Sequence, residues 1–249
     1  MGKIMAEKKS FWTNIPGILK GIGAVIVALT GLYIALNTTQ KSDTGQVLTP
    51  TTTTEALSLT EWPIIAEETF TTEPLNWIIS NYPTERFPRS DLRLVDGKYR
   101  WDIEYSKKDY HSIFCPIGSV INFNVAVDMK LIEHTSDMSF GIIFSSTGND
   151  YYLFDISASR YFGLTRKHDG IEQMIIDWTP ITVAFEPKEW NRMSVVVDDQ
   201  LIRLYLNSEL LSERRDTGFT GGKVGIGLKM YERGETVVDF DNFQFRRKP

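Results

Sequence analysis

Hydrophobic and polar residues alternate along most of the chain beyond residue 60, and this alternation predicts β-strands. The clearest run is SVINFNVAVDMKL, residues 119–131, in which every second residue from Ile121 to Leu131 is apolar and mainly polar residues lie between them. Because successive side chains of a strand point to opposite faces, this pattern is typical of an antiparallel strand with one buried face.

Turn-forming residues divide the rest of this region into short strands. Residues 91–105 predict a hairpin around Asp96-Gly97, a pair that suits a type I′ turn, and Asp199-Gln200 predicts another short turn. Further strands are predicted at 138–145, 150–157, 161–167, 171–178, 192–199, 201–208, 223–231 and 236–245. Many short strands without a convincing helix favour an all-β fold, a two-sheet antiparallel sandwich of the jelly-roll type.

The last predicted strand contains a slip in its pattern. In VVDFDNFQF, Val238 and Phe240 share one face, but the next apolar pair is Phe243 and Phe245 rather than residues 242 and 244. One extra residue in the strand explains the change of phase. We therefore predict a β-bulge at Asp241-Asn242, with phenylalanines pointing into the core on both sides of it.

Residues 15–36, IPGILKGIGAVIVALTGLYIAL, predict a transmembrane α-helix. A helix of this length rises about 33 Å, close to the thickness of a bilayer's hydrocarbon core. Its only charge is Lys20, near one end. Three lysines precede the segment, whereas Lys41 and Asp43 after it cancel, so the N-terminus is expected in the cytoplasm and the rest outside.

The expected organisation is a cytoplasmic stub (1–14), the transmembrane helix (15–36), a linker (37–60) and the β-sandwich (61–249). The linker is rich in threonine and poor in aromatic residues, which is typical of a solvated tether. A cleaved signal peptide is the alternative for the N-terminal segment. Only Ala28 and Thr30 offer a weak match to the small residues that cleavage requires.

Composition excludes several kinds of site. The net charge is −5, and no stripe of basic residues stands out, which argues against a nucleic-acid partner. The single cysteine, Cys115, excludes an internal disulfide and a cysteine-built zinc site, and we expect it to be buried. The three histidines are scattered along the chain, which argues against a histidine-built metal site.

Three C-terminal segments share a spacing of tryptophan, asparagine, glycine and aromatic residues: EWNRMSVVVDDQLIRLYLNSELL, DTGFTGGKVGIGL and VVDFDNFQF. The residues that carry this pattern are Trp190, Asn191, Tyr205, Asn207, Gly222, Gly225, Gly227, Asp241, Asn242 and Phe243, continued more loosely by Phe140, Gly141, Tyr152 and Phe154. The pattern resembles the concanavalin A-like lectin and glucanase superfamily, including laminin-G-type modules and domains related to 3-keto-disaccharide hydrolases. The resemblance spans roughly residues 67–246. Ser208 departs from it, because the family usually has glycine there.

The resemblance implies a jelly roll and, in many members, glycan binding. It also raises a structural calcium ion as a second role for Asp241 and Asn242, with backbone carbonyls near Glu68 as further oxygen ligands. The bulge alone accounts for the two residues, so the metal content stays unknown at this point. No other cofactor is expected.

A glucanase on this fold is expected to carry an E-x-D-x-E strand, which places carboxylates for acid and nucleophile roles on one face. The sequence has no such string and no G-x-S-x-G nucleophile motif. We therefore assign no catalytic residue and favour a non-catalytic module. A hydrolase of the 3-keto-disaccharide type is kept as an alternative.

Aromatic side chains in or beside turns are the candidates for stacking on sugar rings. They are Tyr151, Tyr161, Trp178 and Tyr231, with Asp177 beside the tryptophan as a hydrogen-bonding group. Trp178 is the first choice, and the competing interpretation is that it covers the end of the core. The predicted function is a membrane-anchored, extracytoplasmic module that recognises carbohydrate. A cell-surface domain that binds a protein partner, or acts as a sensor, is the other alternative.

Two further tryptophans, Trp101 and Trp190, are assigned to the core of the sandwich. Both lie within segments whose hydrophobic alternation predicts strands or directly before one. Tryptophans near strand ends usually pack against a core. They are therefore not candidates for ligand contact.

Overall fold

The computed structural model describes residues 62–72, 77–81, 83–115 and 117–249, and every regular element within these ranges is a strand. The all-β prediction for the C-terminal region is therefore confirmed. The predicted cytoplasmic stub, transmembrane helix and linker lie outside the described residues. Within the described ranges, no helix is long and apolar enough to cross a bilayer.

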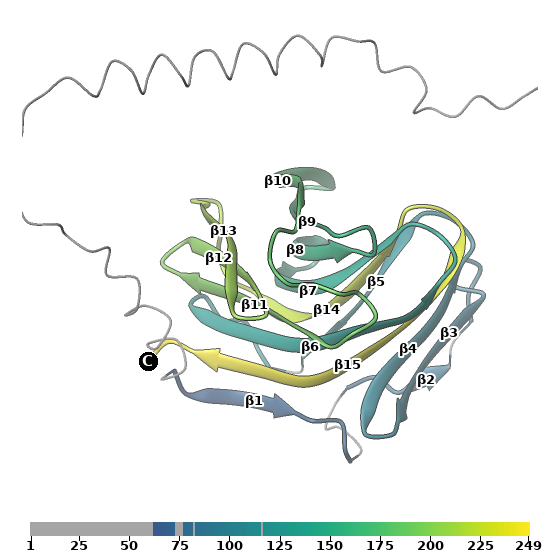
Figure 1. Cartoon of the computed structure of the whole chain (residues 1–249). Helices are drawn as coiled ribbons and strands as arrows, with labels where there is room; N and C mark the ends of the chain where they lie inside the picture. Colours follow the sequence, from purple (N-terminus) through teal and green to yellow (C-terminus); the bar gives the residue numbers. More distant parts are fainter. Residues whose placement is uncertain (1–61, 73–76, 82, 116) are drawn as a thin grey trace, which may run out of the picture. The chain divides into compact units, whose positions relative to one another are not determined.

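Nine strands form the larger of two antiparallel sheets, in the order β13-β12-β11-β6-β15-β4-β3-β2, with β1 beside part of β15 (Figure 1). Their bounds are β1 (Ile64–Glu68), β2 (Ser80–Asn81), β3 (Arg89–Val95), β4 (Lys98–Tyr105), β6 (Phe123–His134), β11 (Asn191–Asp198), β12 (Leu201–Leu206), β13 (Glu209–Arg215) and β15 (Gly234–Arg247). The strand β15 lies inside this sheet, so both of its edges are paired.

Six strands form the second antiparallel sheet, in the order β10-β9-β8-β7-β14-β5. Their bounds are β5 (Asp109–Phe114), β7 (Met138–Thr147), β8 (Asp150–Ser157), β9 (Tyr161–His168), β10 (Ile171–Pro180) and β14 (Lys223–Met230). The two sheets make a sandwich, which agrees with the predicted jelly-roll architecture.

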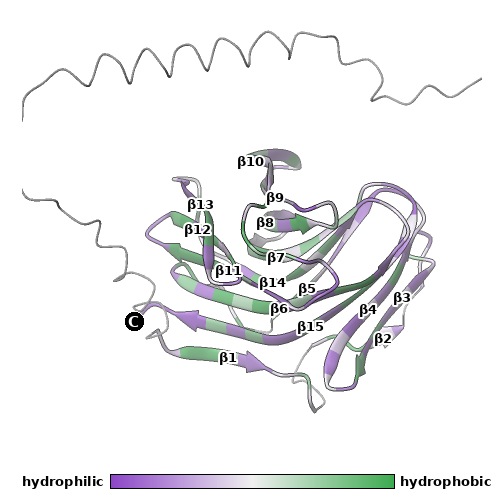
Figure 2. Ribbon diagram, viewed as in Figure 1, coloured by the Kyte–Doolittle hydropathy of each residue, from purple (hydrophilic) through white to green (hydrophobic). Residues whose placement is uncertain are grey.

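The core lies between the sheets and is built by residues at alternate positions. On β4, Tyr99, Trp101 and Ile103 are fully buried, while the residues between them are half-buried. On β8, Phe154 and Ile156 belong to the same core. Figure 2 shows this alternation as changes between hydrophobic and hydrophilic residues along the strands. Burial of large apolar side chains from both sheets supplies the main stabilising term.

The hairpin turns have the backbone that their sequences predict. Asp96 and Gly97 have φ angles of 51° and 71°, and Asp199 and Gln200 have φ angles of 47° and 69°. Positive φ at both central residues is the signature of a type I′ turn. Ser208, the departure from the family pattern, also adopts a positive φ of 69°, so the turn forms without glycine at that position.

The predicted β-bulge in the last strand is confirmed. The pairing of β15 with β6 shifts between Asp241 and Gln244, and Asn242 has a φ of 48°. Phe240 and Phe243, on either side, are both fully buried. Before the bulge β15 pairs with β4, and after it β15 pairs with β1. The extra residue thus lets one strand change partners while its phenylalanines stay in the core.

Side chains hold the bulge in place. The Asn242 amide donates to Asp128 Oδ2 at 2.8 Å, and the Asn242 backbone N–H donates to Asp241 Oδ1 at 2.7 Å. Arg192 donates to Asp128 Oδ1 at 2.8 Å and to the Asn242 carbonyl at 3.2 Å. The Asn242 backbone N–H and carbonyl, which leave the ladder at the bulge, therefore find partners in Asp241 of the same strand and Arg192 of β11.

Aromatic rings pack beneath the bulge. Phe243 lies edge-on to Trp77 at 5.0 Å between ring centroids, and Trp77 lies edge-on to Phe70 at 5.3 Å. Phe240 contacts Trp101 at 5.1 Å. Such edge-to-face pairs add to the stabilisation from burial.

Three assignments of single residues are tested by burial. Cys115 is buried, as expected, and so is Trp101. The assignment of Trp190 to the core is wrong, because its side chain is 38% exposed. The strand β11 begins at the next residue, Asn191, which is buried. The Asn191 amide donates to the carbonyls of Glu186 and Glu189.

The predicted strand 119–131 also starts too early. Ile121 is 58% exposed and lies before β6, which begins at Phe123. The chain makes an isolated bridge from Val120 to Gly222 before the strand starts, and this interrupts the alternation.

The bulge yields a stability prediction. Phe243→Ala should lower the free energy of unfolding by about 3–5 kcal/mol, because it empties a fully buried site. Asn242→Ala should cost about 1–2 kcal/mol, since it removes the bond to Asp128. Asn242→Gly is the matched control, because glycine accepts the positive φ without strain. Chemical denaturation measures all three, and a neutral Phe243→Ala would contradict the assignment of the strand's phase.

Candidate functional site

The six-stranded sheet has a second face that points away from the core. On β8, Phe154 and Ile156 point into the sandwich, so Leu153 and Asp155 point to the opposite face. Leu153 packs there with Ile143 and Tyr151 in a small separate hydrophobic cluster. We call this side of the six-stranded sheet the outer face.

Small side chains in the middle of the sheet leave room on the outer face. At Gly141 on β7, a Cβ atom would lie 2.0 Å from the carbonyl oxygen of Phe154, so the β8 backbone comes too close for any side chain. At Gly163 on β9, a Cβ atom would lie 2.9 Å from Met174 and 3.5 Å from the Trp178 ring. Glycine at 163 therefore lets Met174 and Trp178, both on β10, lie against the sheet.

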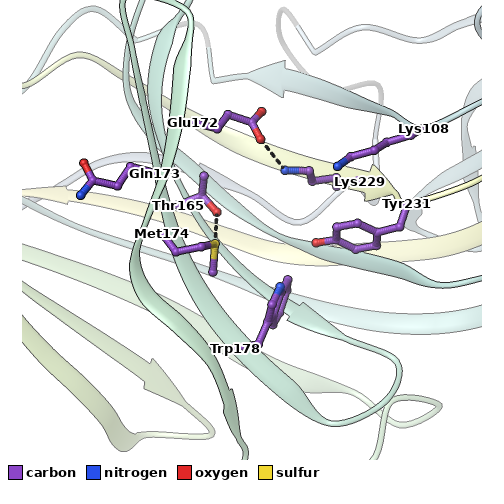
Figure 3. A pocket seen from close by; sticks show the side chains of 8 residues that line it. All are labelled: Lys108, Thr165, Glu172, Gln173, Met174, Trp178, Lys229 and Tyr231. Carbon is purple, nitrogen blue, oxygen red and sulfur yellow. Dashed lines mark hydrogen bonds and ion pairs between the residues drawn. The ribbon is translucent and has the colours of Figure 1, made fainter. Parts of the chain in front are cut away.

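A pocket of about 240 Å³ lies on the outer face (Figure 3). It is lined by Lys108, Thr165, Glu172, Gln173, Met174, Trp178, Lys229 and Tyr231. These residues come from both ends of the sheet, β9 and β10 at one end and the region of β14 and β5 at the other. The rings of Trp178 and Tyr231 meet edge to face, with centroids 6.2 Å apart and planes at 78°.

An ion pair crosses the pocket. Lys229 Nζ lies 3.0 Å from Glu172 Oε2, and the Tyr151 hydroxyl donates to Glu172 Oε1 at 3.0 Å. Burial opposes ionisation of Glu172, but the hydrogen bond and charge of Lys229 outweigh it and hold the pKa of this carboxyl below its usual value. Both carboxylate oxygens are thus engaged, and β10 is tied to β14.

A buried carboxyl lies close to this ion pair. Asp155 is 1% exposed, and its Oδ2 lies 2.5 Å from Ser139 Oγ. Ser139 Oγ lies 3.2 Å from the Tyr231 hydroxyl, which links Asp155 to the pocket wall. Among the described residues, Asp155 Oδ1 has no hydrogen-bond partner. Burial raises the pKa of Asp155 to about 7, although the bond from Ser139 and the charge of Lys229 act in the opposite direction.

The structure brings together two of the five predicted ligand-binding residues. Trp178 and Tyr231 line the pocket, and Trp178 is 36% exposed. Tyr151 shares the outer face but is 2% exposed, so it supports the site through Glu172. Tyr161 and Asp177 are exposed and do not line the pocket. A role for these five residues in ligand binding stays a prediction.

The sequence analysis did not single out Asp155, Glu172 or Lys229. A signal for Asp155 exists, because an acid at an alternating position of the apolar strand DYYLFDIS points to a buried polar group. The pairing of Lys229 with Glu172 gives no such signal. The two residues are 57 positions apart and meet only because β10 and β14 belong to one curved sheet.

Two groups of residues bear on metal binding. Asp150, His168 and Asp169 bring their ligand atoms within 4.8 Å of one another on an exposed surface, where His168 Nδ1 already lies 2.8 Å from Asp150 Oδ2. At the bulge, Arg192 contacts both the Asn242 carbonyl and Asp128, two oxygens beside the calcium site that the resemblance implies. Calcium at this second position stays a hypothesis.

The buried carboxyl yields a pH-dependent prediction. Because the pKa of Asp155 rises from about 4 in the unfolded chain to about 7 in the folded protein, its contribution to stability is lost as pH rises through 7. Asp155→Asn, which cannot ionise, should therefore gain melting temperature relative to the wild type between pH 5 and about pH 8. Thermal denaturation of both proteins at each pH measures this difference. Subtracting the melting temperature of the wild type from that of the variant removes the effect of other titrating groups, which the two proteins share. A difference that does not change with pH would show that Asp155 ionises freely.

The sequence matches no protein-family model and no curated protein. Solved structures do match the fold. A protein of unknown function with a galectin-like fold from Bacillus subtilis has a TM-score of 0.54 and 12% identity, over 74% of this chain and 97% of the other.

Two glycanase structures are similar to the same extent. The catalytic domain of an endo-1,3-β-glucanase from Thermotoga petrophila has a TM-score of 0.53 and 9% identity, over 76% and 99% of the chains. A structure concerning endo-acting O-glycanases of the human gut microbiota has a TM-score of 0.56 and 8% identity, over 75% and 100%. At these identities the likeness establishes the fold alone, and the described residues form a two-sheet antiparallel jelly-roll sandwich.

Proposed function

We propose that the protein is a carbohydrate-binding module and that the pocket lined by Trp178 and Tyr231 holds the sugar. The observation that carries the proposal is the pair of aromatic rings at the pocket, whose centroids lie 6.2 Å apart and whose planes meet at 78°. Aromatic rings offer apolar faces to the C–H groups of a sugar, while polar groups beside them reach its hydroxyls. Lys108, Glu172 and Lys229 are charged groups that line this pocket beside the rings.

The rings are held by rigid elements. Trp178 belongs to β10 and lies over Gly163, and Tyr231 follows β14 directly. The Tyr231 hydroxyl is fixed by Ser139. A site whose shape exists before binding loses less conformational entropy on binding than one made by loops. The jelly-roll likeness to a glucanase and a galectin-like protein supports the same function by analogy.

Binding without catalysis is favoured over hydrolysis. Among the described residues, Glu172 is a carboxyl that lines the pocket, and Asp155 is linked to its wall through Ser139. Glu172 has both oxygens engaged by Lys229 and Tyr151, and Asp155 is buried. A glycosidase requires one carboxyl that reaches the leaving-group oxygen and another that reaches the anomeric carbon or a water. Release of reducing ends from a polysaccharide would move the assignment to a hydrolase.

The second candidate from another class is a domain that binds a protein at the cell surface. Its ligand would cover a wider area than this pocket, because stable protein interfaces bury roughly 800 Å² on each side. A broad glycan panel separates the two functions. Silence on the panel, together with retention by a protein partner, would favour the second.

We also propose that residues 15–36 anchor the module in a membrane with the sandwich on the extracytoplasmic side. The support is the length of this apolar segment and the cluster of lysines before it. A threonine-rich linker at 37–60 would hold the module on the order of 27 Å from the bilayer. A sugar-binding domain in that position can reach glycans at the cell surface.

Trp178→Ala should abolish retention of the purified full-length chain on a polysaccharide that the wild type binds. The wild-type affinity is expected to be weak, about micromolar to millimolar, because a shallow site contacts one or two sugar rings. Affinity chromatography measures retention. The melting temperature should change little, because Trp178 is 36% exposed.

Trp190→Ala is the matched control for this experiment. It removes a tryptophan that is similarly exposed, at 38%, and does not line the pocket. Retention should survive in this variant. If Trp178→Ala lost binding and thermal stability together, Trp178 would be a structural residue and the site would lie elsewhere.

Protease added to intact cells should release the sandwich by cutting within residues 37–60. Immunoblotting of the supernatant detects the released fragment, and a cytoplasmic protein that stays uncut is the control for cell integrity. Recovery of the mature chain from the medium without protease would contradict the anchor.

A further inference from the structure

Most hydrogen-bond acceptors among the side chains of the pocket are already in use. Glu172 accepts from Lys229 through one oxygen and from Tyr151 through the other. Thr165 directs its hydroxyl to the sulfur of Met174 at 3.1 Å (Figure 3). A neutral sugar presents mainly hydroxyl groups, which bind best where free acceptors and donors alternate. The pocket does not offer that balance.

Donors, by contrast, remain free. Lys108 Nζ lies 5.8 Å from the centre of the Tyr231 ring and forms no ion pair with any described residue. The Trp178 indole N–H also has no hydrogen bond within the part of the chain that the structure describes. The Gln173 amide, by contrast, points away from Lys108 and Tyr231 in Figure 3. An ammonium and an indole N–H at one opening match a ligand that is rich in acceptors.

The charge of the outer face favours the same kind of ligand. Lys108, Lys167 and Lys229 lie on it, and among the described residues Glu172 is the acid that pairs with one of them, Lys229. Lys167 Nζ lies 5.6 Å from the centre of the Tyr151 ring, at the side of the pocket.

The acid beside Lys108 in the sequence is engaged elsewhere. Asp109 lies 3.5 Å from Arg86, and no ion pair joins it to Lys108 among the described residues. The Lys108 ammonium therefore remains available to an anionic ligand.

We propose that the pocket selects acidic saccharides, and that the carboxylate of a uronate residue pairs with Lys108. This inference rests on the proposed function and specifies its ligand class. In Figure 3 the ammonium groups of Lys108 and Lys229 lie on the same side of Tyr231. Lys229 is held by Glu172, so Lys108 is the cation that remains free to meet the ligand's charge. The sugar ring lies against Trp178 and Tyr231.

The test compares one polymer in two forms. Polygalacturonate and the same polymer with its carboxyl groups reduced to primary alcohols differ only at C6, which is a charged carboxylate in one and a neutral alcohol in the other. Affinity electrophoresis of the purified full-length chain in gels that contain either polymer measures retardation. We expect retardation by polygalacturonate and at least about tenfold weaker retardation by the reduced form. Raising the salt from about 50 to about 500 mM should weaken the first interaction and leave the second unchanged.

Variants assign the effect to one side chain. Lys108→Gln should weaken binding to polygalacturonate about tenfold and should not alter binding to the reduced polymer. Lys107→Gln, the neighbouring exposed lysine that does not line the pocket, is the matched control and should behave like the wild type.

The outcomes separate this inference from the proposed function. Equal retardation by both polymers, lost in Trp178→Ala but not in Lys108→Gln, would overturn acid selectivity and leave carbohydrate binding in place. Retardation by polygalacturonate that Lys107→Gln weakens as much as Lys108→Gln would show non-specific attraction and overturn the site. Absence of retardation by these polymers and by a panel of neutral and acidic glycans would overturn both.

Discussion

The arrangement of the larger sheet depends on how β15 changes partners at Asp241-Asn242. One strand pairs with β6 along its length, with β4 before the bulge and with β1 after it. The bulge allows this because Asn242 adopts a positive φ, and because Asp241 and Arg192 satisfy the backbone groups that leave the ladder. Without the extra residue, Phe243 and Phe245 would turn to the outer side, and Trp77 would lose its ring contact with Phe243.

The six-stranded sheet forms the site because the central positions of its outer face carry small side chains, whereas β10 and the end of β14 carry large aromatic ones. Gly141 and Gly163 carry no side chain over the sheet, and Trp178 from β10 meets Tyr231 from the end of β14 above it. The ion pair between Lys229 and Glu172 joins β14 to β10. A partly buried ion pair adds little net stability, because desolvation offsets much of the attraction. Its effect here is to fix the distance between β10 and β14, and so the distance between the two rings.

Much of the fold could be predicted from the sequence because it depends on local patterns. Alternation identified most strands, the type I′ pairs identified hairpins, and the slip at Asp241-Asn242 identified the bulge. The failures have local causes too. Trp190 was assigned to the core because it is a large apolar residue next to a strand. The buried residue is Asn191 instead, and its hydrogen bonds to backbone carbonyls cannot be recognised from a hydrophobic pattern.

The site was harder to predict, because its residues meet through the order of strands in a sheet. Turn position suggested Trp178 and Tyr231, and both line the pocket. It also suggested Tyr161, which does not, since position near a turn does not determine which side chains converge. Lys108 precedes β5 at one edge of the sheet, whereas Glu172 belongs to β10 at the other. Only the curvature of the sheet brings these edges to one pocket.

The same geometry relates the shallow pocket to a polymeric ligand. A pocket of about 240 Å³ with one ring pair encloses only part of a saccharide, so a single contact is weak. A polysaccharide carries many identical residues, and the module, held at a membrane as proposed, would rebind to the next one before it diffuses away. Charge adds to this effect, since attraction between an anionic chain and the lysines acts over about 10 Å at moderate salt. Weak recognition at one pocket is therefore compatible with firm attachment to a long acidic chain.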